Sequence, residues 1–195
     1  MIFNKLFIGA RLYLLRFLQD KLHPRIIYYA DKKKKFYSAR ISTSAAIEHS
    51  DRLTLGKNVF IGHHAFIDAT HAIEIADGCQ IAHHATILTH STHDSVRLYG
   101  DAFHNNTNDN TTLKARVKIG AYSFIGSYSL LMPATVLGKG CLVYAYSYVD
   151  GIFPDYSILS GKPAKVIGNT RERDDKLILQ FPELNELYSS WNSKT

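Results

Sequence analysis

The chain has 195 residues, of which 46% are hydrophobic and 21% are charged. These fractions are ordinary for a soluble globular protein, and the length fits one domain with short flanking pieces. Its two cysteines, Cys79 and Cys141, form no Cys-x-x-Cys motif, which excludes a disulfide framework and a thiolate zinc site. Cysteine usage this sparse fits a reducing, cytoplasmic compartment.

The formal net charge of +6 is unevenly distributed along the chain. Residues 1–40 contain most of the excess of lysine and arginine, whereas the remainder is slightly acidic. A basic groove across the whole protein is therefore not indicated, and nucleic acid is not expected as a partner.

Residues 1–40 are predicted to be a basic, amphipathic, largely helical segment. Apolar residues follow helical spacing up to Pro24, and Lys5, Arg11 and Arg16 interrupt them. No apolar run reaches the length of about 18 residues that a membrane span needs, and no signal-peptide cleavage pattern follows. Two interpretations remain open: a helix packed on this protein or a neighbouring subunit, or peripheral contact of residues 1–35 with the inner face of the cell membrane.

A six-residue period dominates the middle of the chain. The longest series of aliphatic residues is Ile119, Ile125, Leu131, Leu137, Val143 and Val149, with a second series of Leu55, Ile61, Ile67 and Ile73. A third series, shifted by two positions, is Ile75, Ile81 and Ile87. Small residues stand four positions after most of these aliphatics, and glycine, alanine or aspartate often follows directly.

This period excludes a helix, because six residues rotate the aliphatic position to the opposite helix face. It predicts a coil of very short strands and tight turns, with one large aliphatic side chain per repeat pointing inward. The glycines are expected where turns need a positive φ, and both cysteines at small inward positions. The expected fold is all-β over residues 41–169, with a polar loop at 94–116 and a short helical cap over 170–195.

The segments IGAYSFIGSYSLLMPATVLGKGCLVYAYSYV and SGKPAKVIG resemble the hexapeptide-repeat acyltransferases. That family includes galactoside and maltose acetyltransferases and the O-acetyltransferases of capsule and lipopolysaccharide synthesis. The resemblance covers about residues 41–169 and implies a left-handed parallel β-helix, although parallel crossovers are generally right-handed. It also implies a homotrimer that binds acetyl-CoA and the acceptor between two subunits.

Two histidines at the start of the polar loop are the candidate general bases. Transfer of an acetyl group to a sugar hydroxyl needs a base, and histidine titrates near working pH. His93 matches the family pattern best, and His90 is the alternative, because the spacing from Ile87 to His93 is one residue longer than in galactoside acetyltransferase. The second ring nitrogen of the base needs an acceptor, which Asp94, Asp68 or a backbone carbonyl could supply.

The resemblance also implies the binding positions. Phe124 matches the aromatic residue beside the acceptor, and we expect Asp68 near the same site. Ser127 and Ala145 correspond to contacts with the pantetheine arm of the cofactor. Lys165, with Lys162 and Arg171, could bind its phosphates. Asp150-Gly151 stands where relatives often carry Thr-Lys, so one cofactor contact is missing or replaced.

His63-His64 and His83-His84 occupy matching positions in adjacent repeats and are expected to stack. They are interpreted as turn residues, with a metal site as the alternative. A zinc lyase similar to the γ-class carbonic anhydrases is disfavoured, because no histidine stands five residues after His83 or His84. We therefore expect an acetyl-CoA-dependent O-acetyltransferase without a metal, acting on a sugar or polysaccharide. N-acetylation of a nucleotide-linked amino sugar is the alternative.

Overall fold

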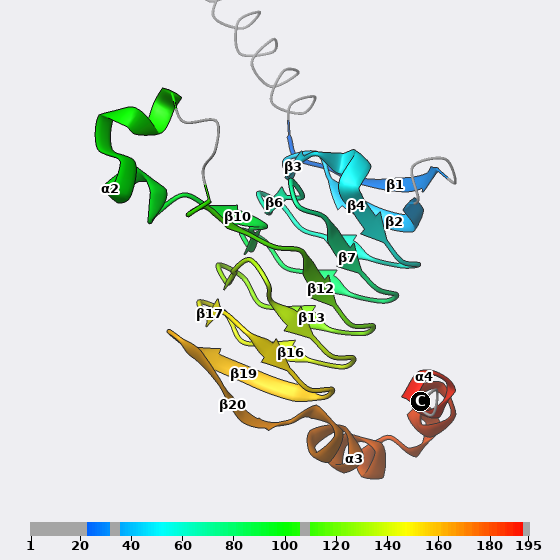
Figure 1. The fold of residues 1–195 in the computed structure, drawn as a ribbon. Helices are drawn as coiled ribbons and strands as arrows, with labels where there is room; N and C mark the ends of the chain where they lie inside the picture. Colours follow the sequence, from blue (N-terminus) through cyan, green and yellow to red (C-terminus); the bar gives the residue numbers. More distant parts are fainter. Residues whose placement is uncertain (1–22, 32–35, 106–109, 193–195) are drawn as a thin grey trace, which may run out of the picture.

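A computed structural model describes residues 23–31, 36–105 and 110–192. Short parallel strands stack into a three-faced coil, whose rungs lie one below the other in Figure 1. The all-β coil expected from the six-residue period is confirmed.

Each face collects one strand from every turn of the coil. The first face contains β4 (Leu53–Leu55), β7 (Ile73–Ile75), β12 (Val117–Ile119), β15 (Val136–Leu137) and β18 (Ile152–Phe153). The second contains β2 (Phe36–Ser42), β5 (Phe60–Ile61), β8 (Gln80–Ile81), β13 (Phe124–Ile125), β16 (Leu142–Val143) and β19 (Ser157–Gly161). The third contains β3 (Ala46–Glu48), β6 (Phe66–Asp68), β9 (Thr86–Ile87), β14 (Leu130–Leu131) and β17 (Tyr148–Val149).

Three-residue strands on the first face explain the two-residue shift in the period. In β7 both Ile73 and Ile75 are buried, with Glu74 between them, so this strand contributes two inward side chains where others contribute one. Ile61 consequently pairs with Ile81, 20 positions later, whereas Phe124 pairs with Leu142, 18 positions later.

The core is the aliphatic column that the period predicted. Ile61, Ile67, Ile81, Ile125 and Val143 are fully buried, and successive coils bury an apolar column that a single coil would leave in water. The small residues at the corners are buried as well. Corner hydroxyls are hydrogen-bonded: Ser129 Oγ donates to the carbonyl of Tyr144. Both cysteines are buried free thiols, and burial raises the pKa of Cys79 to about 12.

The glycines after the inward aliphatics have a different role from the one expected. Gly126 and Gly138 are not among the positive-φ residues. A Cβ atom on Gly126 would lie 2.5 Å from the backbone nitrogen of Ala145 in the next coil, so close approach between coils requires glycine there. Most left-handed corner positions are instead taken by larger residues, including His64, His84 and Tyr128, whereas Gly78 and Gly140 do have the positive φ that was expected of glycine.

The segment expected to be helical gives way to strand structure at β1 (Ile26–Asp31), which pairs antiparallel with β2. Its β-branched and aromatic residues favour a strand, and the first coil begins before residue 41. Residues 1–22, which carry the predicted amphipathic helix, lie outside the described residues. Within the described part, no helix has the length and apolar character needed to cross a bilayer.

The polar excursion contains short strands and helices and begins earlier than residue 94. Its base is an antiparallel ribbon of β10 (His90–Ser91) and β11 (Leu113–Lys114). Beyond the ribbon stand helix α2 (Ser95–Tyr99) and the 3₁₀ helix η3 (Gly100–Asn105), which project from the side of the coil in Figure 1.

The C-terminal part contains helices within the expected cap over 170–195, on either side of Pro182. The hairpin of β19 and β20 (Ala164–Asn169) and helix α3 (Thr170–Gln180) cover one end of the coil. After η4 (Pro182–Leu184), helix α4 (Asn185–Asn192) brings Trp191 against Tyr122, with ring centroids 4.4 Å apart. The last helix therefore packs on a corner of the coil instead of its open end.

Candidate active site

His90 lies where the chain leaves the coil, at the corner between the third and first faces. It follows Thr89, which is buried after β9, and it is the first residue of the β10–β11 ribbon. The buried Ile87 anchors the backbone that precedes His90, and the pairing of β10 with β11 anchors the backbone at His90 itself. The corner therefore holds His90 between two regular pieces of backbone.

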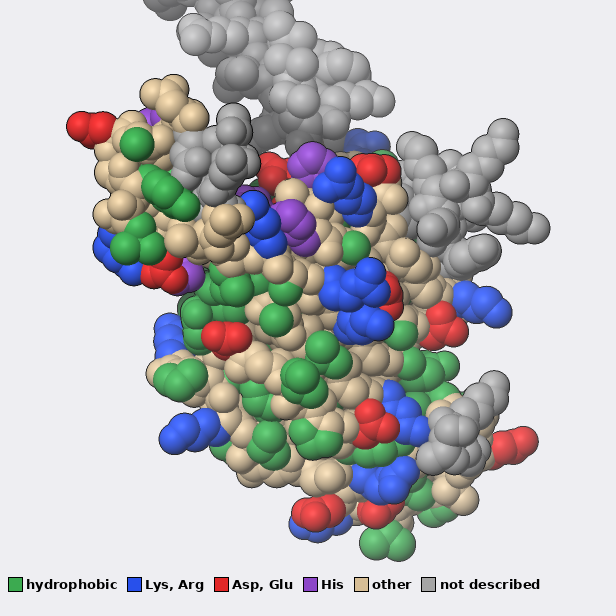
Figure 2. All heavy atoms as spheres, viewed as in Figure 1, with side chains coloured by type: hydrophobic (Ala, Val, Ile, Leu, Met, Phe, Trp, Pro, Cys, Tyr) green, Lys and Arg blue, Asp and Glu red, His purple; other side chains and the backbone are tan. Residues whose placement is uncertain are grey.

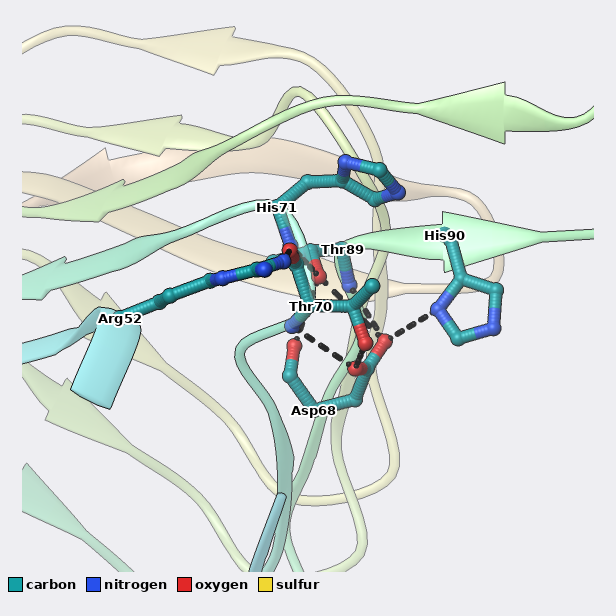
Figure 3. Close-up of polar contacts among 6 residues, drawn as sticks. All are labelled: Arg52, Asp68, Thr70, His71, Thr89 and His90. Atoms are coloured by element: carbon teal, nitrogen blue, oxygen red, sulfur yellow. Dashed lines mark hydrogen bonds and ion pairs between the residues drawn. The ribbon is translucent and has the colours of Figure 1, made fainter. Parts of the chain in front are cut away.

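Asp68 is the hydrogen-bond partner of His90. The two side chains lie one coil apart, with Asp68 Oδ2 at 2.6 Å from His90 Nδ1 (Figure 3). Asp68 ends β6 and is only 1% exposed. Its other hydrogen bonds come from the backbone N–H and hydroxyl of Thr70, at 3.0 and 2.5 Å, and from the backbone N–H and hydroxyl of Thr89, both at 3.3 Å.

These hydrogen bonds keep Asp68 ionised. Burial alone would raise the pKa of the Asp68 carboxyl, but the donors from Thr70, Thr89 and His90 outweigh it and lower the pKa to about 2. An ionised carboxylate can only accept hydrogen bonds, so the proton shared with His90 belongs to Nδ1. In the neutral ring, Nε2 is then the basic atom, and it points away from Asp68 in Figure 3.

His93 lies further out, on the excursion. Its Nδ1 is 2.8 Å from the hydroxyl of Ser91, and its Nε2 is 3.4 Å from Asp94 Oδ2. Its side chain is 52% exposed, against 39% for His90. Asp94 also binds Arg97. Polar atoms thus face both nitrogens of His93, and its carboxylate partner is exposed, whereas the partner of His90 is buried.

The positions expected to bind the cofactor lie at another corner, between the second and third faces. Ser127 and Ala145 are in successive turns, and the backbone N–H of Tyr146 donates to the carbonyl of Ser127 at 3.0 Å. Lys162 Nζ lies 5.8 Å from the ring centroid of Tyr146, which places a cation next to this corner. Lys165 is exposed on β20, close to the same hairpin tip.

Arg171 and Phe124 are separated from these groups. Arg171 lies at the far end of β20 from Lys165, where its guanidinium stacks on Tyr156 and donates to Asn192 Oδ1 at 3.1 Å. Phe124 is on the outer side of the second face, next to Tyr144 and Leu177. Within one chain, neither residue meets His90.

The paired histidines stack along the corner that carries Ser127, as expected. The rings of His63 and His83 are 5.1 Å apart and nearly parallel, and those of His64 and His84 are 5.0 Å apart. His84 stacks on Tyr128, which stacks on Tyr146. Among the described residues, no group of three metal-ligating side chains could hold a metal ion.

Sequence reasoning missed Thr70 and Thr89, which hold Asp68, and Lys114, which stands opposite His90 in the ribbon. The sequence did contain an indication that Asp68 is a functional residue. It follows an inward aliphatic at a position otherwise taken mostly by glycine or alanine, and a carboxylate at such a tight corner needs several donors.

Known proteins share this fold and part of this sequence. No protein-family model matches the chain. A probable acetyltransferase of Mycobacterium tuberculosis is 31% identical over 124 residues, which are 64% of this chain and 37% of that protein. The galactoside O-acetyltransferase of Escherichia coli is 22% identical over 160 residues, which are 78% of this chain and 74% of that enzyme.

A solved N-acyltransferase from Bacillus cereus, in complex with dTDP and 3-hydroxybutyryl-CoA, superposes with a TM-score of 0.58. It is 20% identical, over 80% of this chain and 96% of that one. The chain therefore has the left-handed β-helix fold that is known from hexapeptide-repeat acyltransferases, and the fold expected from the sequence is confirmed. It spans little more than a third of the Mycobacterium relative, 37% of its length.

Proposed function

We propose that this protein is an acetyl-CoA-dependent O-acetyltransferase that acts on a sugar hydroxyl, with His90 as the general base. The observation that carries the proposal is the 2.6 Å contact between His90 Nδ1 and the buried carboxylate of Asp68. A histidine acting as a base needs one ring nitrogen held in a fixed tautomer and the other open to the acceptor. His93 ranks first by sequence pattern, but it has no buried partner of this kind.

The geometry supports a direct transfer. Acetyl-CoA, when bound, supplies the thioester carbonyl that the acceptor oxygen attacks. His90 Nε2 takes the proton of the attacking hydroxyl, while the Asp68 carboxylate stabilises the imidazolium that forms. The same proton can then pass from Nε2 to the departing thiolate, which returns His90 to its neutral form.

The cofactor positions follow the pattern of the fold. We propose that the pantetheine arm runs past Ser127 and Ala145, whose small side chains leave room at the corner, and that Lys162 and Lys165 bind the phosphates. Arg171 is less suitable because Tyr156 and Asn192 occupy its guanidinium. Phe124 would contact an acceptor only from a neighbouring subunit, so the proposal includes a homotrimer.

A surface polysaccharide or its precursor is the proposed acceptor. The galactoside O-acetyltransferase among the relatives supports a hydroxyl acceptor. The basic residues 1–35, most of which lie outside the described residues, support a cytoplasmic protein in peripheral contact with the membrane, where a lipid-linked sugar would be presented.

The test is acetyl transfer by the purified full-length protein, followed as release of the CoA thiol with a panel of glycosides. We expect His90→Ala to lower kcat by about 10²–10⁴-fold and the matched His93→Ala to stay within about threefold of the native rate. The reverse result would assign the base to His93. Absence of CoA turnover with every acceptor would contradict the proposed function.

Matched hydroxyl and amino sugars distinguish O-transfer from N-transfer. An amine needs less help from a base than a hydroxyl, so His90→Ala should affect an amino-sugar acceptor less. We expect the native protein to prefer the hydroxyl member of each pair, and mass spectrometry of the product identifies the acetylated atom.

A further inference from the structure

His71 is a second imidazole at the corner that holds the candidate base. It follows Asp68 in the turn that leaves β6, and its ring meets that of His90 edge to face, with centroids 6.2 Å apart. Both histidines are half-buried. Figure 2 shows histidine side chains at the surface where the excursion leaves the coil. A ligand that reaches His90 therefore comes close to His71 as well.

The backbone of His71 is tied to the structure that holds His90. Its N–H donates to Thr89 Oγ1 at 2.9 Å, and the Thr89 hydroxyl donates in turn to the backbone carbonyl of Asp68 at 2.8 Å. Thr89 directly precedes His90 in the chain, so one buried threonine sets the spacing of the two imidazoles. The position of His71 thus depends on the contact between successive coils and is not that of a free loop.

The ring nitrogens of His71 have no partner within the described part of the chain. Neither nitrogen forms a hydrogen bond or an ion pair there, whereas Nδ1 of His90 is bound to Asp68. In Figure 3 the ring of His71 projects away from Asp68, beside His90. A half-buried imidazole whose polar atoms lack protein partners is suited to bind a polar ligand.

The environment of His71 keeps its ring neutral. Its pKa is lowered first by burial and then by the charge of a protonated His90. Of the other charged groups around it, Lys114 on β11 and Arg52 at the end of η2 (Ser50–Arg52) also lower this pKa, and Asp68 raises it. Neutral imidazole offers one N–H donor and one lone pair, and it does not repel the imidazolium that forms on His90 during transfer. Both properties suit a group that holds an uncharged hydroxyl.

We infer that His71 binds a second hydroxyl of the acceptor, on the carbon atom next to the one whose hydroxyl His90 deprotonates. Two hydrogen bonds of about 2.8 Å, joined by the short distance between oxygens on neighbouring carbons, span two imidazoles whose centroids are 6.2 Å apart. The inference rests on the proposed function. It narrows the acceptor to a sugar with a vicinal diol and makes His71 a residue that determines specificity.

The first experiment compares each glycoside that the protein acetylates with its analogue lacking the neighbouring hydroxyl. We expect the native kcat/KM to be about tenfold or more lower on the deoxy analogue, which is the effect of one good hydrogen bond. His71→Phe keeps an aromatic ring beside His90 but has no polar atom, so it should use both acceptors equally. His71→Gln keeps a donor and an acceptor and should retain part of the preference.

His49→Phe is the matched control and should keep the native preference, because His49 is exposed and precedes η2 at the same end of the coil. Equal use of the diol and the deoxy analogue by the native protein would overturn the inference and leave the proposed function intact. A lower kcat of His71→Phe on both acceptors, in equal proportion and with unchanged KM, would also overturn it, since His71 would then act only through His90.

The second experiment measures binding without catalysis. Methyl glycosides of glucose, galactose and mannose are titrated into the full-length protein without acetyl-CoA, and the histidine ring resonances are followed by NMR. We expect saturable shifts of the His71 and His90 signals with at least one glycoside, and loss of the His71 shift with its deoxy analogue. If these shifts appear but no sugar is acetylated, the proposed function fails and the diol site stands. No saturable His71 shift with any of the three glycosides would overturn the inference.

Discussion

Asp68 and His90 are 22 positions apart in the sequence and one coil apart in space. Sequence reasoning placed His90 and His93 at the start of the excursion, because the repeat visibly breaks there. It could not rank them by their partners, since the carboxylate that holds His90 comes from the preceding coil and is itself held by Thr70, two residues further on, and by Thr89, next to His90. Whether a histidine of this coil has a carboxylate partner depends on which residues of the neighbouring coil lie beside it, and the sequence around the histidine does not show this.

Asp68→Asn should therefore lower kcat by about 10²–10⁴-fold, as in other enzymes where the acid partner of a base histidine becomes an amide. An asparagine NH₂ can donate to Nδ1 and so select the tautomer that protonates Nε2, which leaves no basic atom for the acceptor. Turnover is measured with saturating acetyl-CoA.

Asp94→Asn is the matched control, since Asp94 faces His93 at 3.4 Å, and it should remain within about threefold of native activity. Circular dichroism and CoA binding verify that both variants fold. Native turnover by folded Asp68→Asn would show that the carboxylate does not orient the base.

At the scale of elements, the six-residue period predicted the strands, the inward column and the stacking of the histidine pairs, because each depends on positions that repeat. The β10–β11 ribbon and β1 were missed, since their antiparallel pairing does not follow the repeat. The role of the glycines was misjudged for a related reason. A glycine without a Cβ atom lets the next coil approach closely. The residues of that coil are about 18 positions later in the chain, so the sequence of a single turn does not reveal the contact.

The histidine column should make the coil less stable in mild acid. Burial, followed by the neighbouring imidazoles of His83 and His64, lowers the pKa of His63 in the folded protein, so the unfolded chain binds protons more readily. The associated stability is present above the unfolded pKa of about 6.5 and is lost as the pH falls below it. Asp68 does not contribute to this pH dependence, because its pKa of about 2 keeps the carboxylate ionised throughout the mildly acidic range.

We therefore expect the thermal unfolding midpoint, measured by circular dichroism, to fall between neutral pH and mildly acidic pH. His63→Gln should flatten this dependence. His104→Gln, which removes an exposed histidine from the excursion, should leave it unchanged. Parallel pH curves for native protein and His63→Gln would contradict a role for the column.

At the scale of the whole molecule, the proposed site is divided between two corners of the coil. His90 and Asp68 occupy the corner between the third and first faces, whereas Ser127 and Ala145 occupy the corner between the second and third. The width of the third face separates them within one chain. A hydroxyl held at His90 could then meet a thioester lying along Ser127 only if the second corner belongs to another copy.

This separation predicts complementation between two inactive variants. His90→Ala removes the base but keeps the cofactor corner, and Ser127→Trp fills that corner but keeps the base. Each should be inactive alone. If they are unfolded and refolded together in equal amounts, random assembly leaves about a quarter of the interfaces with both an intact His90 and an intact groove, since each site in a cyclic oligomer takes one half from each of two neighbouring subunits. Activity near that fraction, with a particle mass of three chains by light scattering, is the expected result. A mixture no more active than its components, in particles of the same mass, would place the whole site within one chain.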